Sequence, residues 1–219
     1  MTEQELIEFL KSSPKLYHMA EFESWPSIKK RGLLSTSAIL DFYDVKGNQR
    51  RVIEEVRRAQ SVLLTHETLP PITIRDQIPM NENALRKCLL DGLQPADWYR
   101  LLNQRVFFWP SKERLLRLLG ARAYRNKRHD ILKINSLSLF ENYRDAITLS
   151  PINSGATLFN PQPRGKDTLS RISTYPYSER PKGKRVAEVA VHRGVPDLAK
   201  YVVRVSEMQG ANEIREIAL

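Results

Sequence analysis

Two side chains, His18 and Glu188, stand in sequence patterns that could support catalysis. His18 lies within residues 16–20, a short stretch that we expect to be extended. In an extended segment His18 shares a face with Leu16 and Ala20, while Tyr17 and Met19 share the other face. Such a histidine is either half-buried with one satisfied hydrogen bond or part of a ligand site, and both interpretations stay open.

Glu188 is the only acidic residue in residues 186–191, a run otherwise made of valine and alanine. Alternation along a strand places its carboxylate on the same face as Val186 and Ala190. A carboxylate among apolar neighbours must be solvated in a cleft, paired with a cation or protonated. The alternative is an edge-strand glutamate that faces water.

Two stretches combine features that suit polyanion binding. The loop before Glu188 contains Tyr175, Tyr177, Arg180, Lys182, Lys184 and Arg185. Cations can hold phosphates and aromatic rings can stack on bases, although a solvated loop is the alternative. Residues 112–128, predicted to be a helix capped by Ser111, carry seven Lys and Arg against Glu113, a surplus of six. A solvated helix face is the alternative here.

The overall composition narrows the class of protein. With 35 Lys and Arg against 25 Asp and Glu, the 219 residues carry a net charge of +10, which suits a polyanionic partner. Apolar runs such as residues 106–109 fall far short of the roughly 18 residues of a membrane span, so we expect no membrane association. The acidic N-terminus is unlike a signal peptide, and the single cysteine, Cys88, allows no internal disulfide. We therefore expect a cytoplasmic protein.

Several common chemistries have no anchor in this sequence. Its nine glycines form neither a dinucleotide-binding nor a P-loop fingerprint. The four histidines and Cys88 are too dispersed to predict a metal site. A G-x-S-x-G nucleophile elbow is also absent.

The elements that must position these residues are helices followed by a late run of short strands. We expect helices over residues 48–60, from Asn81 or Asn83 to Gly92, from Pro95 and from Ser111. We expect strands over residues 16–20, 105–109, 130–134, 146–149, 185–191 and 201–205. Residues 150–184 lack apolar periodicity and are a candidate functional loop or lid. This order predicts one α+β domain over residues 1–219.

Short motifs resemble known families. Tyr17-His18, Trp25, Ser27, Ile28 and Gly32-Leu33-Leu34 resemble the opening motif of ADP-ribosyltransferase folds, a strand histidine followed by a short helix that ends in Gly-Leu. The order of the later elements is similar to the DarT group of bacterial DNA ADP-ribosyltransferase toxins. More closely, the chain resembles an uncharacterised bacterial family that shares the motifs at residues 16–19, 74–77, 96–100, 105–109, 151–155 and 164–165.

The resemblance implies an ADP-ribosyltransferase-like fold in which two small packed β-sheets, surrounded by helices, form a cleft for NAD. It implies that His18 hydrogen-bonds the adenosine ribose and that the Met19 backbone holds the nicotinamide amide. It further implies Tyr17, Ser27, and Phe108 or Trp109 in the NAD site, Glu188 as the catalytic acid, and Arg51 or Arg50 on the NAD phosphate. This chain departs from many such transferases in having Met19 and Ala20 after the histidine.

The resemblance implies transfer of ADP-ribose from NAD to a nucleic-acid base, in DNA rather than RNA, by a toxin or defence enzyme. Such an enzyme needs an antitoxin or an ADP-ribose hydrolase as its partner. A non-catalytic module that binds nucleic acid or nucleotide is the alternative. An RNA 2′-phosphotransferase of the same fold ranks below both, because the surroundings of His18 lack the extra histidine and arginine that we expect for it.

Overall fold

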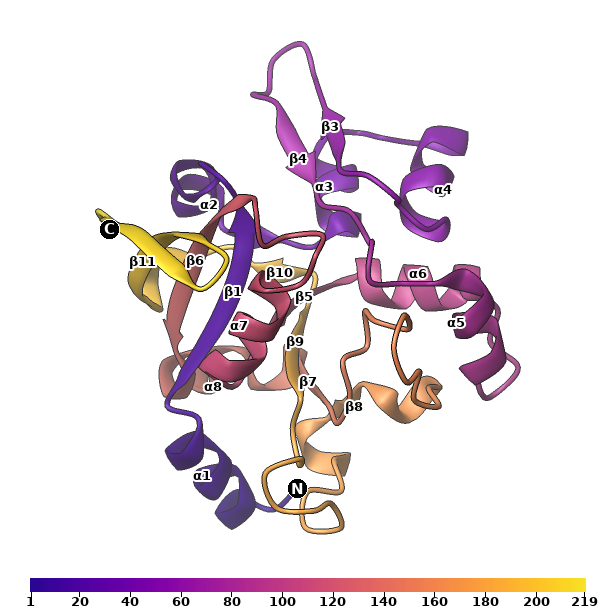
Figure 1. Ribbon diagram of the computed structural model, residues 1–219, viewed down its shortest axis with the longest axis vertical. Helices are drawn as coiled ribbons and strands as arrows, with labels where there is room; N and C mark the ends of the chain where they lie inside the picture. The colour runs from indigo at the N-terminus through magenta and orange to yellow at the C-terminus, as the bar shows by residue number, and fades with distance from the viewer.

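Two four-stranded antiparallel sheets form the centre of the molecule. The computed structural model describes residues 1–219 (Figure 1). The first sheet has the order β1 (Lys15–Glu21), β6 (Arg128–Asn135), β11 (Val202–Gln209) and β12 (Asn212–Ile217). The second has the order β5 (Arg105–Phe108), β9 (Glu188–His192), β7 (Ile147–Ser150) and β8 (Ser170–Arg171). Two small antiparallel pairs are added, β2 (Leu33–Leu34) with β10 (Gly194–Val195) and β3 (Val62–Leu64) with β4 (Ile72–Ile74).

The two sheets meet at a single backbone pair between β1 and the end of β5. The Tyr17 amide donates to the Trp109 carbonyl at 2.9 Å, and the Trp109 amide donates to the Tyr17 carbonyl at 2.8 Å. The ladder does not continue, because the Phe107 carbonyl is hydrogen-bonded to Nδ1 of the His18 ring at 2.8 Å. Beyond the Tyr17–Trp109 pair, β1 and β5 therefore separate and leave room between the sheets.

Alternation decides which side chains face the core. On β5 and β9, Phe108 pairs with Val189, and both side chains are fully buried in the largest hydrophobic cluster. Phe107 and Trp109 project from the opposite face of β5 because side chains alternate along a strand. Glu188 precedes Val189 and therefore shares that second face.

Eight α-helices surround the sheets. They are α1 (Glu3–Ser12), α2 (Trp25–Arg31), α3 (Thr36–Phe42), α4 (Gly47–Glu55), α5 (Glu82–Cys88), α6 (Pro95–Asn103), α7 (Lys112–Leu119) and α8 (Ser136–Tyr143). In Figure 1, α3, α4 and the β3–β4 hairpin lie together beside the two sheets, and they share their own small apolar cluster. No helix is both long and apolar enough to span a membrane.

The structure confirms the mixed α and β character and most of the predicted strands. Several predicted boundaries are wrong, among them the end of the helix predicted to reach Gly92, which lies at Cys88. The helix over residues 48–60 ends at Glu55, and the basic helix over residues 112–128 ends at Leu119, before Gly120. The strand over residues 185–191 begins only at Glu188. The short helices α3 and α8 and the last strand, β12, were not predicted.

Gly32 ends α2 in a conformation that no other residue fits. Its φ is +81°, and a Cβ built there would lie 2.3 Å from the Pro196 Cα. Gly183 has the same φ of +81° but nothing within 4 Å of its Cβ position.

We predict that Gly32→Ala destabilises the protein more than Gly183→Ala does. Both variants carry the strain of positive φ, about 1 kcal/mol, but only Gly32→Ala must also move the Pro196 backbone. Thermal unfolding checks this, with an expected extra loss of at least ~2 kcal/mol, or roughly 4–8 °C in melting temperature. Equal melting temperatures for the two variants would contradict the close approach at Gly32.

Candidate functional site

Two adjoining cavities lie where β1 and β5 separate. The larger, about 360 Å³, includes His18 and is called the His18 cavity. The smaller, about 250 Å³, includes Glu188 and is called the Glu188 cavity. Thr36, Arg75, Arg105 and Phe107 line both cavities. His18 and Glu188 therefore lie on two sides of one boundary, not in one undivided cleft.

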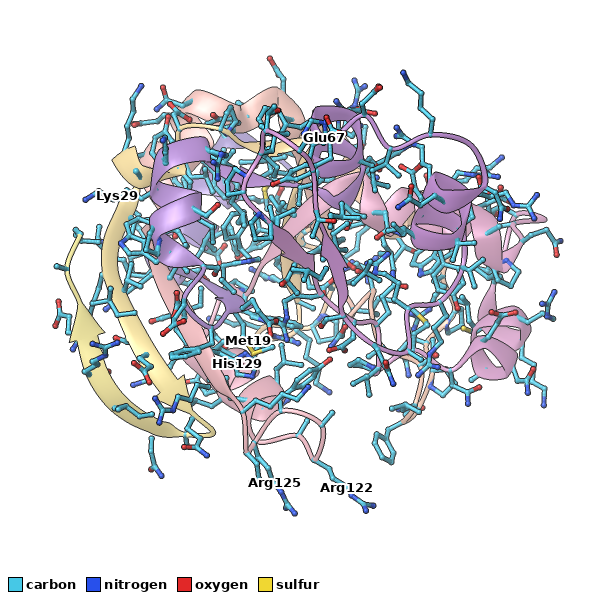
Figure 2. The ribbon with its side chains drawn as sticks, turned by 90° about the horizontal axis from the view of Figure 1, so that it is seen from above. Met19, Lys29, Glu67, Arg122, Arg125 and His129 are labelled. Atoms are coloured by element: carbon cyan, nitrogen blue, oxygen red, sulfur yellow. The ribbon has the colours of Figure 1, made fainter.

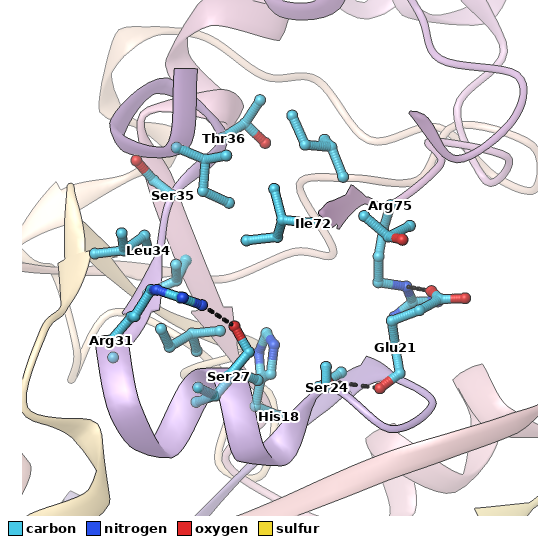
Figure 3. Close-up of a pocket in the computed structure, with 18 of the residues that line it drawn as sticks. His18, Glu21, Ser24, Ser27, Arg31, Leu34, Ser35, Thr36, Ile72 and Arg75 are labelled. Atoms are coloured by element: carbon cyan, nitrogen blue, oxygen red, sulfur yellow. Dashed lines mark hydrogen bonds and ion pairs between the residues drawn. The ribbon is translucent and has the colours of Figure 1, made fainter. Parts of the chain in front are cut away.

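The His18 cavity has arginines on opposite sides (Figure 3). On one side Arg31 donates to the Ser27 hydroxyl at 3.1 Å, which fixes both side chains at the end of α2. On the other side, Nε of Arg75 lies 3.4 Å from a Glu21 carboxylate oxygen. Of the residues predicted for the NAD site, His18 and Ser27 thus line this cavity, between two cations, whereas Tyr17 lines neither cavity.

The hydrogen bond of His18 fixes its tautomer. Because its partner is the Phe107 carbonyl, which can only accept, Nδ1 carries the proton and Nε2 presents a lone pair. Burial lowers the pKa of His18 to about 4, with a further contribution from the Arg75 charge. The ring is therefore neutral at physiological pH, and Nε2 can accept a hydrogen bond from a ligand hydroxyl.

Glu188 is a buried carboxyl held from one side only. The Ser154 amide and hydroxyl both donate to Oε2, at 2.9 and 2.6 Å. No protein group bonds Oε1, and Glu188 lines the Glu188 cavity. Burial raises the pKa of Glu188 to about 7, although the Ser154 hydrogen bonds and the Arg114 and Arg164 charges act in the opposite direction. A carboxyl that titrates near neutral pH can take or release a proton under physiological conditions.

The aromatic residues of β5 divide between cavity and core. Phe107 lines both cavities and Trp109 lines the Glu188 cavity. Phe108, which was predicted for the NAD site, is fully buried and lines neither cavity, so it cannot contact a ligand there, whereas Phe107 can. The sequence motif contains both residues, but which of them faces the cavities depends on long-range strand pairing, which the sequence does not reveal.

Met19 contributes its backbone at the boundary between the cavities. The pairing of Tyr17 with Trp109 directs every second residue of β1 to present its backbone N–H and C=O toward β5. The backbone groups of Met19, two residues further on, therefore point the same way. Its carbonyl accepts a hydrogen bond from Nη1 of Arg75 at 2.8 Å. Arg75 therefore occupies the backbone group at which the resemblance places the nicotinamide amide.

The arginines predicted for the NAD phosphate lie elsewhere. Arg51 is exposed on α4 and lines neither cavity, so its catalytic assignment has no support in the geometry. Arg50 is paired with Asp41 and Glu54. Arg75 and Arg105 are the arginines between the cavities, and the fold brings both there from segments far from α2. The motif at residues 74–77 was the only sequence signal for Arg75.

The two tyrosines predicted to stack on bases belong to the core. Tyr175 and Tyr177 are buried and line neither cavity. Tyr175 donates its hydroxyl to the Arg185 carbonyl, and the Arg185 guanidinium lies 4.5 Å from the Tyr177 ring centroid. The stacking prediction is therefore wrong, because the rings are needed to close the core beneath this loop. The other predicted cations of the loop, Arg180, Lys182 and Lys184, also lie outside both cavities.

A group of cations that make no ion pair lies next to the Glu188 cavity. Leu118 and Tyr124 line that cavity, and exposed or half-buried cations lie around them on α7 and the following turns. Lys112, Arg114, Arg117, Arg122, Arg125 and Lys127 make no ion pair, whereas Arg128 pairs with Glu207. Figure 2 shows Arg122 and Arg125 projecting away from the body of the molecule.

We predict that Glu188→Gln changes how stability depends on pH. Since burial raises the pKa of Glu188 from 4.5 to about 7, the folded chain keeps a proton that the unfolded chain releases. The wild type should therefore lose stability relative to the variant as the pH rises from about 4.5 to about 8, by up to about 3 kcal/mol. Denaturant unfolding across this range measures it, with the exposed Glu141→Gln as control. Parallel curves for wild type and Glu188→Gln would rule out the raised pKa.

Comparison with known proteins gives a family but no function. No curated protein and no solved structure matches the chain. Residues 14–202 match the model of a family described as a family of unknown function, DUF7002. The matched range includes β1 with His18, the segment of Arg75, and β9 with Glu188. Since the match covers most of the sequence, the chain belongs to the DUF7002 family.

Proposed function

We propose that the His18 and Glu188 cavities together bind NAD and that the protein is an NAD-dependent ADP-ribosyltransferase. The observation that supports this most is the separation of β1 and β5, which leaves two cavities that meet at Arg75 and Phe107. One contains a neutral histidine and the other a carboxyl that titrates near neutral pH. An elongated ligand with two riboses would match this division.

The His18 cavity would hold the adenosine part. His18 would accept a hydrogen bond from a ribose hydroxyl through Nε2, the nitrogen that the Phe107 contact leaves free. Arg31 and Arg75 on opposite sides would supply positive charge for the phosphates. To admit nicotinamide at the Met19 backbone, Arg75 would have to leave the Met19 carbonyl.

The Glu188 cavity would hold the nicotinamide end, with Phe107 and Trp109 as its aromatic walls. When the bond between nicotinamide and ribose breaks, its electron pair stays on nicotinamide and positive charge develops on the ribose. An ionised Glu188 would stabilise that charge through its free oxygen. The acceptor then bonds to the ribose carbon, and Glu188 would take the proton that the acceptor loses.

The acceptor in this proposal is a nucleic-acid base, with DNA preferred to RNA. A nucleic-acid acceptor is supported by the six unpaired cations of residues 112–127, next to Leu118 and Tyr124 of the Glu188 cavity. A cytoplasmic enzyme of this kind would need a partner that neutralises or reverses it, an antitoxin or an ADP-ribose hydrolase. A non-catalytic module is the competing proposal, because Arg75 already occupies the Met19 carbonyl.

We predict label transfer from NAD to single-stranded DNA, and its loss by at least about 100-fold in Glu188→Gln, since that variant lacks the base and the negative charge. Purified protein is incubated with NAD labelled in its adenylate part and with DNA, RNA or protein. The rate should rise with pH around the Glu188 pKa of about 7. Glu141→Gln is the control. Tight DNA binding without transfer, unchanged in Glu188→Gln, would instead support the non-catalytic module.

We also predict that Arg122→Ala/Arg125→Ala weakens binding to single-stranded DNA and reduces its salt dependence. Removing one cation that neutralises a phosphate lowers the slope of log affinity against log salt by about 0.7, so the double variant should lower it by about 1.4. Fluorescence anisotropy over a salt series measures the slope. Lys29→Ala/Lys30→Ala on α2 removes the same charge elsewhere on the surface. An equal effect of both double variants would argue against a specific surface.

A further inference from the structure

Arg164 is an arginine buried without a carboxylate partner. Its side chain is 1% exposed and forms no ion pair. Instead it donates to three backbone carbonyls, those of Ser154 at 2.9 Å, Ala156 at 3.0 Å and Gln162 at 3.1 Å. Burying a charged guanidinium costs desolvation free energy. The position of Arg164 therefore indicates a role other than packing.

The carbonyl of Ser154 connects Arg164 to Glu188. It accepts from Arg164 and also from Nε1 of Trp98 at 3.2 Å. The amide and hydroxyl of the same serine donate to Oε2 of Glu188. Ser154 is thus fixed through its carbonyl by two buried donors and holds the carboxyl with its own two donors.

The backbone of Arg164 is itself fixed to the end of α5. Its amide donates to the Cys88 carbonyl, and its carbonyl accepts from the Leu90 amide, both at 2.9 Å. Its guanidinium lies 5.7 Å from the ring centroid of Trp98, on α6. Helices α5 and α6 therefore hold the guanidinium at a fixed point behind the Ser154 loop.

We propose that Arg164 is a positioning residue for Glu188: acting through Ser154, it holds one carboxyl oxygen in place, leaves the other free toward the cavity, and favours the ionised form. Two hydrogen bonds to one oxygen stabilise a carboxylate, and a nearby positive charge does the same. Hydrogen bonds in such a buried chain polarise one another. The catalytic meaning of this arrangement rests on the proposed function, whereas the arrangement itself can be tested without any substrate.

The test is the titration of Glu188, followed by carbon NMR of its carboxyl group in the wild type and in Arg164→Lys, Arg164→Met and Ser154→Ala. We expect the pKa of Glu188 to move upward in all three, by about one pH unit or more in Arg164→Met, a tenfold change in proton affinity. Lysine keeps the positive charge but cannot donate to three carbonyls in the planar geometry of arginine. Arg164→Lys should therefore keep part of the stabilisation of ionised Glu188 and raise its pKa less than Arg164→Met does.

Leu139→Ala is the matched control, because Leu139 is fully buried in α8, which takes no part in the hydrogen-bond chain and lies outside the apolar cluster of Trp98. It should lower the melting temperature and leave the Glu188 titration unchanged. The proposal is overturned if the Arg164 variants titrate like the wild type, or if Leu139→Ala shifts the titration equally. Should Arg164→Met not fold, Arg164→Lys and Ser154→Ala decide. A shifted titration in a protein that transfers nothing from NAD would refute the proposed function and leave this inference intact.

Discussion

The site depends on one backbone pair, Tyr17 with Trp109, and on the interruption that follows it. The pair joins the two sheets, and the His18 ring then takes the Phe107 carbonyl that would have continued the ladder. A side chain thereby replaces a backbone partner, and the strands separate without leaving a buried carbonyl unsatisfied. The same bond fixes the tautomer of His18. The separation of the strands and the free Nε2 lone pair of His18 are both consequences of the hydrogen bond between His18 and the Phe107 carbonyl.

On the other side of this opening, electrostatics determines the behaviour of Glu188. Burial favours its protonated form, while Ser154 and the arginines around it favour the ionised form, and the balance places its pKa near 7. The positive charges that compensate it, on the buried Arg164 and the half-buried Arg114, make no ion pair with the carboxyl, and Ser154 bonds only Oε2, so one carboxyl oxygen stays free. Arg75 lies between the two cavities and touches the Met19 backbone. Any ligand long enough to span both cavities must contact or displace that side chain.

The sequence was sufficient to predict the local features and insufficient for the assembled site. The strand character of β1, β5 and β9 follows from alternation. His18 and Glu188 can be predicted as site residues because an imidazole and a carboxyl group stand among apolar neighbours. The faces of β5 could not be assigned, because they depend on the long-range pairing of Tyr17 with Trp109. Arg75 and Arg105 were missed for the same reason. Tyr175 and Tyr177 were misassigned because a tyrosine in a basic loop can equally close the core.

A crystal structure of the Glu188→Gln variant with NAD would show whether the opening between β1 and β5 holds a dinucleotide. We expect a ribose hydroxyl within hydrogen-bond distance of His18 Nε2, the nicotinamide ring between Phe107 and Trp109, and the Arg75 side chain moved off the Met19 carbonyl. If saturating NAD left both cavities empty, with Arg75 still bonded to Met19, the dinucleotide site would be refuted.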